Sequence, residues 1–272
     1  MGFTHNMILD ISHITAYHFD KPPQYGLQQI RLTPKDRTGQ SVVRWEVEFI
    51  GAKKEAVFSD HHNNITYLIS TTPGATQLTI TAKGKVNMID QQGIVGPHAG
   101  FAPLWLYLRN TPLTTPGAGV KAFAKTLENP IPSTLDSLHN LSKAIGKTVS
   151  YRTGQTNAMT TAEDAIKIGA GVCQDHSHIF IAAARLAGFP ARYVSGYLMM
   201  NDRIDQEATH AWAEVYIPDL GWTGFDVSNK ISPDARYVRV ATGLDYSDAS
   251  PISGLTFGGQ NESISVDVQV QQ

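Results

Sequence analysis

The sequence predicts an α+β chain of two domains, an antiparallel β-sandwich over residues 1–95 and a mixed domain over residues 96–272. A length of 272 residues suggests two domains more readily than one. The first ninety or so residues consist of β-rich runs separated by turn residues, without helical stretches rich in Ala, Leu and Glu. The second part combines an Ala-rich helical run with strands around a hairpin. A helix packed on an antiparallel sheet is therefore expected there.

Strand signals fill the first part of the chain. Apolar residues at Val43, Trp45, Val47 and Phe49 alternate with charged ones, which is typical of a strand with one buried face. Further β-rich runs cover residues 8–19, 65–70 and 78–82. The turn-prone segment 60–64 contains His61 and His62, which are interpreted as a solvated turn.

The second part begins with a Gly- and Pro-rich segment, residues 93–132, that is expected to be a linker. Helical periodicity then covers residues 135–145, and a capping box at residues 160–163 opens a short helix that is expected to run to Ile168. A further helix is expected to start at Cys173 and to be stopped by Gly188 and Pro190. Strands are predicted at residues 191–198, 210–217 and 222–227, the last two forming a hairpin around the turn 218–221. The tail carries one more β-like alternation, residues 264–270.

Charge and cysteine content exclude several classes of protein. The formal net charge of −2, without a long run of one sign, is unlike a protein that binds nucleic acid or an anionic membrane. The first residues, Met1 to Asn6, have neither the basic nor the apolar part of a signal peptide. Cys173 is the single cysteine and cannot form an internal disulfide, so a reducing, cytoplasmic location is expected.

Cys173 occupies the position that most favours a reactive thiol. It lies where a glycine-punctuated loop gives way to the Ala-rich helix. Free backbone N–H groups and the positive end of the helix dipole favour an anion at this point, and the thiolate is the nucleophilic form of cysteine. Gly171 allows a sharp turn into the helix and leaves room for a substrate.

His210 and Asp226 complete the set of residue types needed for thiol-based acyl transfer: a nucleophile, a base and a group that orients the base. They lie on the two arms of the predicted hairpin. Because side chains alternate between faces, the two share a face only if opposed residue numbers add to an even value, as with Trp212 or Glu214 opposite Asp226. The expected chemistry is attack of the thiolate on an amide carbonyl to give a thioester, which water or an amine then resolves.

The tetrahedral oxyanion formed in such a reaction needs hydrogen-bond donors. The backbone N–H of Cys173 is the first candidate. Tyr151 is the second, with Trp105 and Gln174 as weaker ones.

Four motifs together resemble the bacterial transglutaminase-like superfamily, many of whose members are labelled cysteine proteases. They are Gly-Val-Cys-Gln-Asp-His-Ser-His at residues 171–178, Gly-Phe-Pro-Ala-Arg-Tyr-Val-Ser-Gly-Tyr at 188–197, His-Ala-Trp-Ala-Glu-Val-Tyr at 210–216 and Gly-Trp-Thr-Gly-Phe-Asp at 221–226. Residues 30–34, 39–42 and 60–64 are similar to the family's N-terminal β region, although Asn63 stands where glycine is usual. The resemblance implies a papain-like α+β domain and a triad of Cys173, His210 and Asp226. Members include hydrolases and amine transferases, so the acyl acceptor stays open.

Other interpretations of the same residues are a metal site and a non-catalytic peptide-binding module on this fold. Cys173 and His176 share a helical face and could bind metal with His210. We expect no metal and no cofactor, because a thiol–imidazole–carboxylate set in this order is better explained as a triad. Asp175, His176 and Trp212 are expected to support the site, and the partner is expected to be a peptide or protein with an amide carbonyl.

Overall fold

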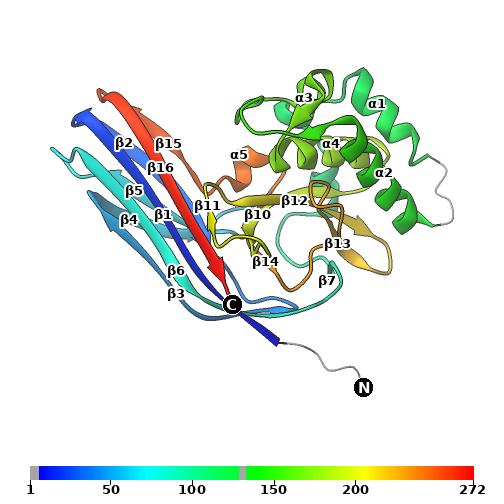
Figure 1. Ribbon diagram of the computed structural model, residues 1–272, viewed down its shortest axis with the longest axis horizontal. Coiled ribbons are helices and arrows are strands. Elements are labelled where there is room, and N and C mark those ends of the chain that lie inside the picture. Colours follow the sequence, from blue (N-terminus) through cyan, green and yellow to red (C-terminus); the bar gives the residue numbers. More distant parts are fainter. Residues whose placement is uncertain (1–5, 129–132) are drawn as a thin grey trace.

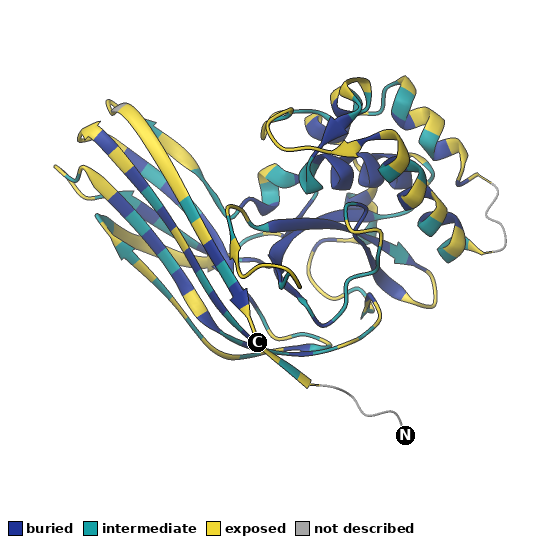
Figure 2. Ribbon diagram, in the orientation of Figure 1, coloured by how far each residue is buried: buried dark blue, intermediate teal, exposed yellow. Residues whose placement is uncertain are grey.

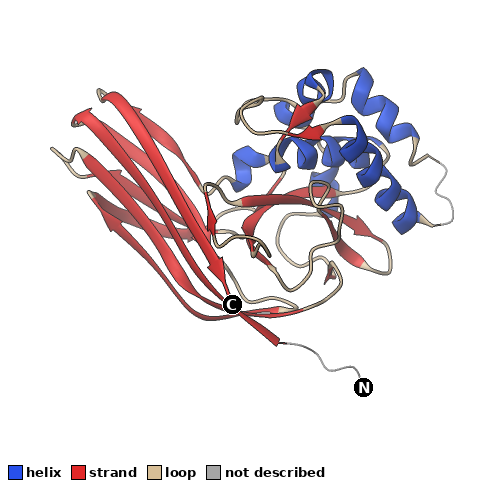
Figure 3. Ribbon diagram, in the orientation of Figure 1, coloured by secondary structure: helices blue, strands red, loops and turns tan. Residues whose placement is uncertain are grey.

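The computed structural model describes residues 6–128 and 133–272. The absence of a signal peptide was predicted from residues 1–6, and residues 1–5 lie outside the described range. Figures 1 and 3 show an all-β half beside a half in which helices cover one side of a second sheet. The α+β class and the order of the two halves are confirmed.

The β half is an antiparallel sandwich. One sheet has the order β11-β16-β1-β6-β3 and the other β15-β2-β5-β4. Their strands are β1 (Asn6–Lys21), β2 (Tyr25–Thr33), β3 (Gln40–Ile50), β4 (Ala52–Ser59), β5 (Ile65–Thr71), β6 (Gln77–Ile89), β11 (Asp205–Gln206), β15 (Ile252–Phe257) and β16 (Gln260–Gln271). Buried and exposed positions alternate along β1 and β6, so side chains of period two fill the space between the sheets.

The second half contains a five-stranded antiparallel sheet, β14-β10-β12-β13-β7. Its strands are β7 (Ile94–Gly96), β10 (Ala191–Leu198), β12 (His210–Ile217), β13 (Gly221–Phe225) and β14 (Tyr237–Gly243). Around it lie η1 (Leu104–Leu108), η2 (Pro112–Thr114), α1 (Ala118–Lys125), α2 (Thr134–Thr148), α3 (Ala162–Ile168), α4 (Cys173–Leu186), α5 (Tyr246–Ala249) and the short parallel pair β8 (Ser150–Tyr151) and β9 (Ala170–Gly171).

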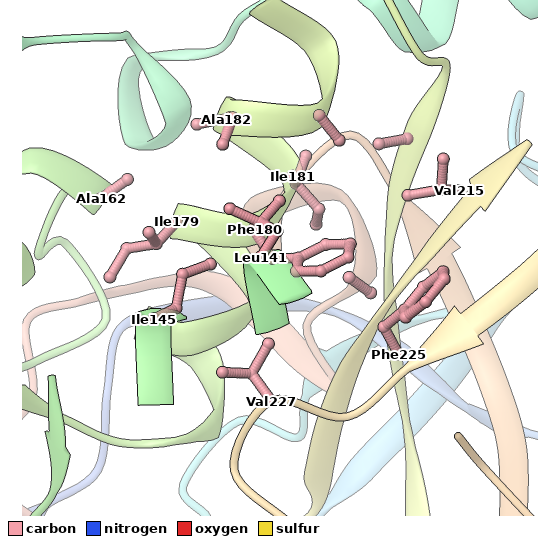
Figure 4. Packing of buried hydrophobic residues seen from close by; sticks show 14 of the residues in the cluster. Leu141, Ile145, Ala162, Ile179, Phe180, Ile181, Ala182, Val215, Phe225 and Val227 are labelled. Atoms are coloured by element: carbon pink, nitrogen blue, oxygen red, sulfur yellow. The ribbon is translucent and has the colours of Figure 1, made fainter. Parts of the chain in front are cut away.

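The helix α4 is buried between the sheet and the other helices. Its apolar side chains pack with residues of α2, α3, β12 and β13 in one core cluster, part of which Figure 4 shows around Phe180 and Phe225. Those two rings stack with centroids 5.0 Å apart. The helix that carries Cys173 is therefore held on most of its sides, which fixes the position of its first turn.

The strands β10, β13 and β14 are buried along their whole lengths (Figure 2). Helices cover one face of this sheet, and part of the other face meets the sandwich, where Leu9 and Val86 pack with Tyr197 and Val238. Cover on both faces explains why β10, Ala191–Leu198, lacks the strict alternation of apolar and polar residues that a half-exposed strand shows.

The end of the chain does not follow the expected division at residue 95. The strand β16 pairs with β1 and β15 pairs with β2, so both belong to the sheets of the sandwich, although they fall within residues 96–272. Conversely β7 pairs with β13 in the second sheet. The alternation at residues 264–270 marks a strand, but period two does not say which sheet edge the strand joins.

The segment 93–132 is more ordered than the expected linker. Its described part contains β7, η1, η2 and α1, and Val120 of α1 is fully buried in the core beside α4. Pro112 lies in the first turn of η2, where its missing N–H costs nothing. Residues 129–132 of this segment lie outside the described residues. No helix in the described part of the chain has both the length and the apolar character needed to cross a membrane.

Candidate active site

Cys173 is the first residue of α4, as predicted, and is partly buried. Asp175 shapes this helix start, because its Oδ2 accepts hydrogen bonds from the Val172 N–H and the Thr156 hydroxyl, both at 2.7 Å. A Cβ on Gly171 would lie 2.6 Å from the same oxygen. Glycine is therefore required here by the close approach of the capping carboxylate, a reason that differs from the predicted sharp turn.

His210 and Asp226 meet, with Nε2 of the imidazole 2.6 Å from Oδ2 of the carboxylate. Both side chains are buried, at 7% and 1% exposure. The hairpin pairs Ala213 with Phe225, and continuing this register sets Trp212 opposite Asp226. The two numbers add to an even value, so the structure agrees with one of the two registers that sequence parity allowed.

The imidazole lies on the face of the sheet that α4 does not cover. Ala211, Ala213 and Val215 pack in the core with α4, so alternation turns His210 to the other face. Because His210 is the first residue of β12, its ring still comes near the Cys173 thiol at the end of the strand, close enough for the charge of Cys173 to affect the pKa of the imidazole. Nε2 is held by Asp226, which leaves Nδ1 for the sulfur.

The electrostatics of this group favour a charged imidazole. Burial disfavours the cation, but the charge of Cys173 and the hydrogen bond that the ring donates to Asp226 outweigh it and raise the pKa of His210 to about 10. For Asp226, burial raises the pKa. The hydrogen bond and charge of His210 oppose this more strongly, so the net pKa is lowered. A charged imidazole between the sulfur and the carboxylate is the form of His210 that this arrangement stabilises.

Two residues that the sequence did not single out hold the carboxylate. The Asn229 side chain donates to Asp226 Oδ2 at 2.7 Å and its backbone N–H donates to Oδ1 at 3.1 Å. The hydroxyl of Tyr237 donates to Oδ2 at 2.8 Å. The spacing Asp-x-x-Asn is a turn signal that could have pointed to Asn229. The sequence around Tyr237 gives no such signal, because β14 comes near Asp226 only through the pairing of strands in the folded sheet.

His176 is connected to the same turn and is not positioned as a metal ligand with Cys173. Its Nδ1 lies 2.8 Å from the Ser228 hydroxyl and its Nε2 lies 2.9 Å from the Val149 carbonyl oxygen, so both ring nitrogens have hydrogen-bond partners. Burial lowers the pKa of this imidazole, and the neutral ring bridges α4 to the segment that follows Asp226. This geometry disfavours the alternative metal site of Cys173, His176 and His210.

The remaining predicted site residues have different surroundings. Tyr151 pairs with Gly171 across β8 and β9, and burial followed by the charge of Cys173 raises the pKa of its hydroxyl. Gln174 instead donates its amide to the Ala158 carbonyl at 3.2 Å. Trp212 stacks beside His210, with ring centroids 6.3 Å apart. Trp105, on η1, is 62% exposed.

One group in the described residues offers donor atoms suited to a metal outside this site. These are His61, His62 and Asp248, whose ligand atoms lie within 4.8 Å of one another. The expected solvated turn is wrong for His62, which is buried and hydrogen-bonded through Nε2 to Asp248 at 3.1 Å. Its Nδ1 is buried without a hydrogen-bond partner among the described residues.

A buried helix carrying a thiol at its first residue, beside a strand histidine bonded to a carboxylate, defines the class of thiol enzymes with a papain-like arrangement of helix and sheet. The chain belongs to the transglutaminase-like superfamily. Residues 121–227 match the family "Transglutaminase-like superfamily", and residues 9–87 match the "Bacterial transglutaminase-like N-terminal region".

The chain is also similar to relatives and, in its fold, to a solved structure. The chain is 30% identical to "Uncharacterized protein Rv2569c" of Mycobacterium tuberculosis, over 96% of this chain and 90% of the relative. It is 29% identical over 104 residues to a "Protein-glutamine gamma-glutamyltransferase" of Pseudomonas aeruginosa, covering 33% of this chain and 15% of that protein. The fold is similar to that of a "Putative Cysteine Protease" from Cytophaga hutchinsonii, with a TM-score of 0.76, 20% identity and coverage of 98% and 99% of the two chains.

Proposed function

We propose that the protein is a thiol enzyme that transfers or hydrolyses acyl groups at amide or peptide carbonyls through a thioester. Cys173 is the nucleophile, His210 the acid and base, and Asp226 the group that orients and stabilises the imidazolium. The observation that carries this proposal is the buried 2.6 Å contact of His210 with Asp226, on a ring near enough to Cys173 for the sulfur to affect its pKa. A histidine held between these two groups has the geometry of general acid–base catalysis.

In the first half of the reaction, the Cys173 sulfur attacks the substrate carbonyl carbon and forms the C–S bond. The oxyanion lies near the helix start, where the first N–H groups of α4 have no intrahelical acceptor. We assign the Cys173 N–H as one donor and the Tyr151 hydroxyl as a second. Collapse of the tetrahedral species breaks the C–N bond, and the leaving amine takes the proton from His210.

In the second half, water or an amine attacks the thioester while His210 accepts its proton. The C–S bond breaks and the thiolate returns. A hydrolase and an acyltransferase share every step up to the thioester, so they differ only in whether water or an amine attacks it. The partial likeness to a protein-glutamine gamma-glutamyltransferase favours testing amine acceptors beside water.

Trapping of the acyl-enzyme tests this function. The protein is mixed with a library of glutamine-containing and other peptides at acid pH, quenched, and its intact mass measured. The expected result is a mass increase, labile to hydroxylamine, that localises to Cys173 and is absent from Cys173→Ala. Peptides that bind wild type and Cys173→Ala equally, without any adduct, would instead support a peptide-binding module.

The substrate proposed is a peptide or protein with an accessible amide carbonyl, and the location proposed is the cytoplasm. The single cysteine and the net charge of −2 support these choices over nucleic-acid or membrane partners. We propose no metal or cofactor, since the thiol mechanism needs none. Fractionation of cells followed by immunodetection tests the location, and recovery outside the cytoplasmic fraction would contradict it.

A further inference from the structure

The strand β14 is at the edge of the second sheet, with β10 on one side. An edge strand presents unpaired N–H and C=O groups unless something covers them. Here the register shifts by one residue between Ser195 and Gly196 of β10, so one residue of β14 is extra. Such a bulge changes the alternation of peptide groups, and Arg239 and Thr242, three residues apart, both turn their peptide groups to the free edge.

Gln40 binds the first of these groups as a neighbouring strand would. Its Oε1 accepts from the Arg239 N–H at 2.9 Å, and its Nε2 donates to the Arg239 carbonyl at 3.0 Å. Nε2 also donates to the Lys35 carbonyl at 2.9 Å, and the side chain is 2% exposed. The residue is the first of β3, so it belongs to the sandwich.

Asn64 repeats the same arrangement on the second group. Its Oδ1 accepts from the Thr242 N–H at 2.8 Å, and its Nδ2 donates to the Thr242 carbonyl at 2.8 Å. Nδ2 also donates to Asp60 Oδ2 at 3.0 Å, which fixes the amide orientation. Asn64 is 3% exposed and directly precedes β5 of the sandwich. Four buried hydrogen bonds therefore join β14 to the sandwich through two side-chain amides.

The clamped strand also carries a group that contacts the triad. Tyr237, two residues before Arg239, donates its hydroxyl to Asp226 Oδ2 at 2.8 Å. Tyr237 is buried at 3% exposure and meets Trp212 edge to face, with centroids 5.5 Å apart. The path from either amide to the carboxylate consists of the backbone of one short strand and one side chain.

We propose that Gln40 and Asn64 are positioning residues of the active site. By clamping β14, the sandwich fixes the position of the Tyr237 hydroxyl relative to Asp226. The hydrogen bond between them then holds the carboxylate against His210. The proposal rests on the proposed function of Cys173, His210 and Asp226. It gives the N-terminal half a role in the chemistry, and it explains why amides, which donate and accept at once, occupy both positions.

The test measures the rate of Cys173 alkylation by iodoacetamide from pH 5 to 9 in Gln40→Glu, Asn64→Asp and their double variant. A carboxylate keeps the shape and the acceptor but loses the donor. We expect a severalfold lower rate at pH 6, with the acid limb of the profile moved to higher pH by about one unit. The reason is that a displaced β14 loses the charge-assisted hydrogen bond from the Tyr237 hydroxyl to Asp226. Tyr237→Phe should give the same shift, and adding Gln40→Glu to it should change little more.

Matched variants separate positioning from loss of stability. Gln28→Glu changes a buried amide of the same sandwich that does not bond β14, and it should leave the profile at the wild-type position. If Gln40→Glu does not fold, Gln40→Met removes both bonds without burying a charge. Folded clamp variants with the wild-type profile, or an unchanged Tyr237→Phe, would overturn the proposal.

Wild type and His210→Ala are measured in the same series. If these two have equal, slow rates, the proposed thiol function fails and the clamp proposal falls with it. If they differ while the clamp variants match wild type, the clamp proposal alone is wrong.

Discussion

His210 is the residue on which the charge of the site depends. It has a carboxylate on Nε2 and the sulfur nearby, and these two groups raise its pKa to about 10 against the effect of burial. A histidine with either partner alone would be less basic. The protonation state of this one ring therefore reports whether sulfur and carboxylate are both in place.

Replacing the sulfur should be visible in that ring. In Cys173→Ala the negative charge beside His210 is gone, so we expect the pKa of His210 to fall well below its wild-type value. Nuclear magnetic resonance of ring-labelled histidine, followed from pH 5 to 10, measures this directly. His176, whose pKa burial lowers, is the internal reference and should not change. An unchanged pKa for His210 would contradict contact between ring and sulfur.

Asp226 shows what can be predicted at the scale of single residues. The types and order of Cys173, His210 and Asp226 led to their prediction as a triad, and the predicted contact of His210 with Asp226 is present in the structure. Asn229 and Tyr237 were missed, since a hydrogen bond to a carboxylate is made by many residue types and Tyr237 comes from a strand whose place in the sheet is not encoded locally.

At the scale of elements, one face of the hairpin β12–β13 carries both His210 of the candidate site and a buried ion group around Glu214. Beyond Trp212 along that face, Glu214 accepts from Arg192 at 2.7 Å and from Arg239 at 2.8 Å, and all three side chains are at most 8% exposed. The Arg192 guanidinium also lies 3.8 Å over the ring of Trp222. This ion group ties β10, β12 and β14 together beneath the site.

Removing the central charge of this group should destabilise the protein strongly. Glu214→Gln leaves two buried guanidinium groups without a counter-charge, and we expect a loss of about 3–5 kcal/mol in the free energy of unfolding, as for other broken buried pairs. Urea denaturation followed by circular dichroism measures it. Glu46→Gln, at a side chain that is 67% exposed, is the control and should change stability by less than about 0.5 kcal/mol. Equal stabilities for the two variants would refute this role of Glu214.

Elements of strong local pattern were predicted well, and their partners were not. The strands at 191–198 and 210–217 and the helix beginning at Cys173 agree with the observed bounds, because apolar period, turn residues and Gly188 act locally. The return of β15 and β16 to the sandwich could not be predicted, since pairing depends on which edges are free after the rest has folded.

At the scale of the whole molecule, the two halves share buried polar contacts as well as a core. Besides the two amides on β14, His13 of β1 lies 3.0 Å from the Tyr197 hydroxyl of β10 through Nδ1 and 3.0 Å from the Thr15 hydroxyl through Nε2. Burial lowers the pKa of His13 to about 4. In the helical half, burial and then the charge of Arg185 lower the pKa of His178 to about 3.

These two histidines make stability depend on acid. Their folded pKa values are below the unfolded value near 6.5, so the unfolded chain binds more protons; their contribution is full above about pH 6.5 and is lost as the pH falls toward 4. We expect urea midpoints to decrease steadily from pH 7 to pH 4.5. His13→Gln cannot take up that proton. Its free energy of unfolding should therefore decrease less than that of the wild type over this range, by up to about 3 kcal/mol. His18→Gln, exposed on the same strand, should behave as wild type, and identical slopes for all three proteins would contradict the prediction.

The central claim is that a thiol, an imidazole and a carboxylate from distant parts of the chain act as one unit. The rate at which iodoacetamide alkylates Cys173 at pH 6 tests it most directly, compared with free cysteine and with His210→Ala. The predicted result is a rate at least tenfold above free cysteine in the wild type, because the imidazolium keeps the sulfur ionised, and loss of that advantage in His210→Ala. Equal and slow alkylation of wild type and variant would contradict it.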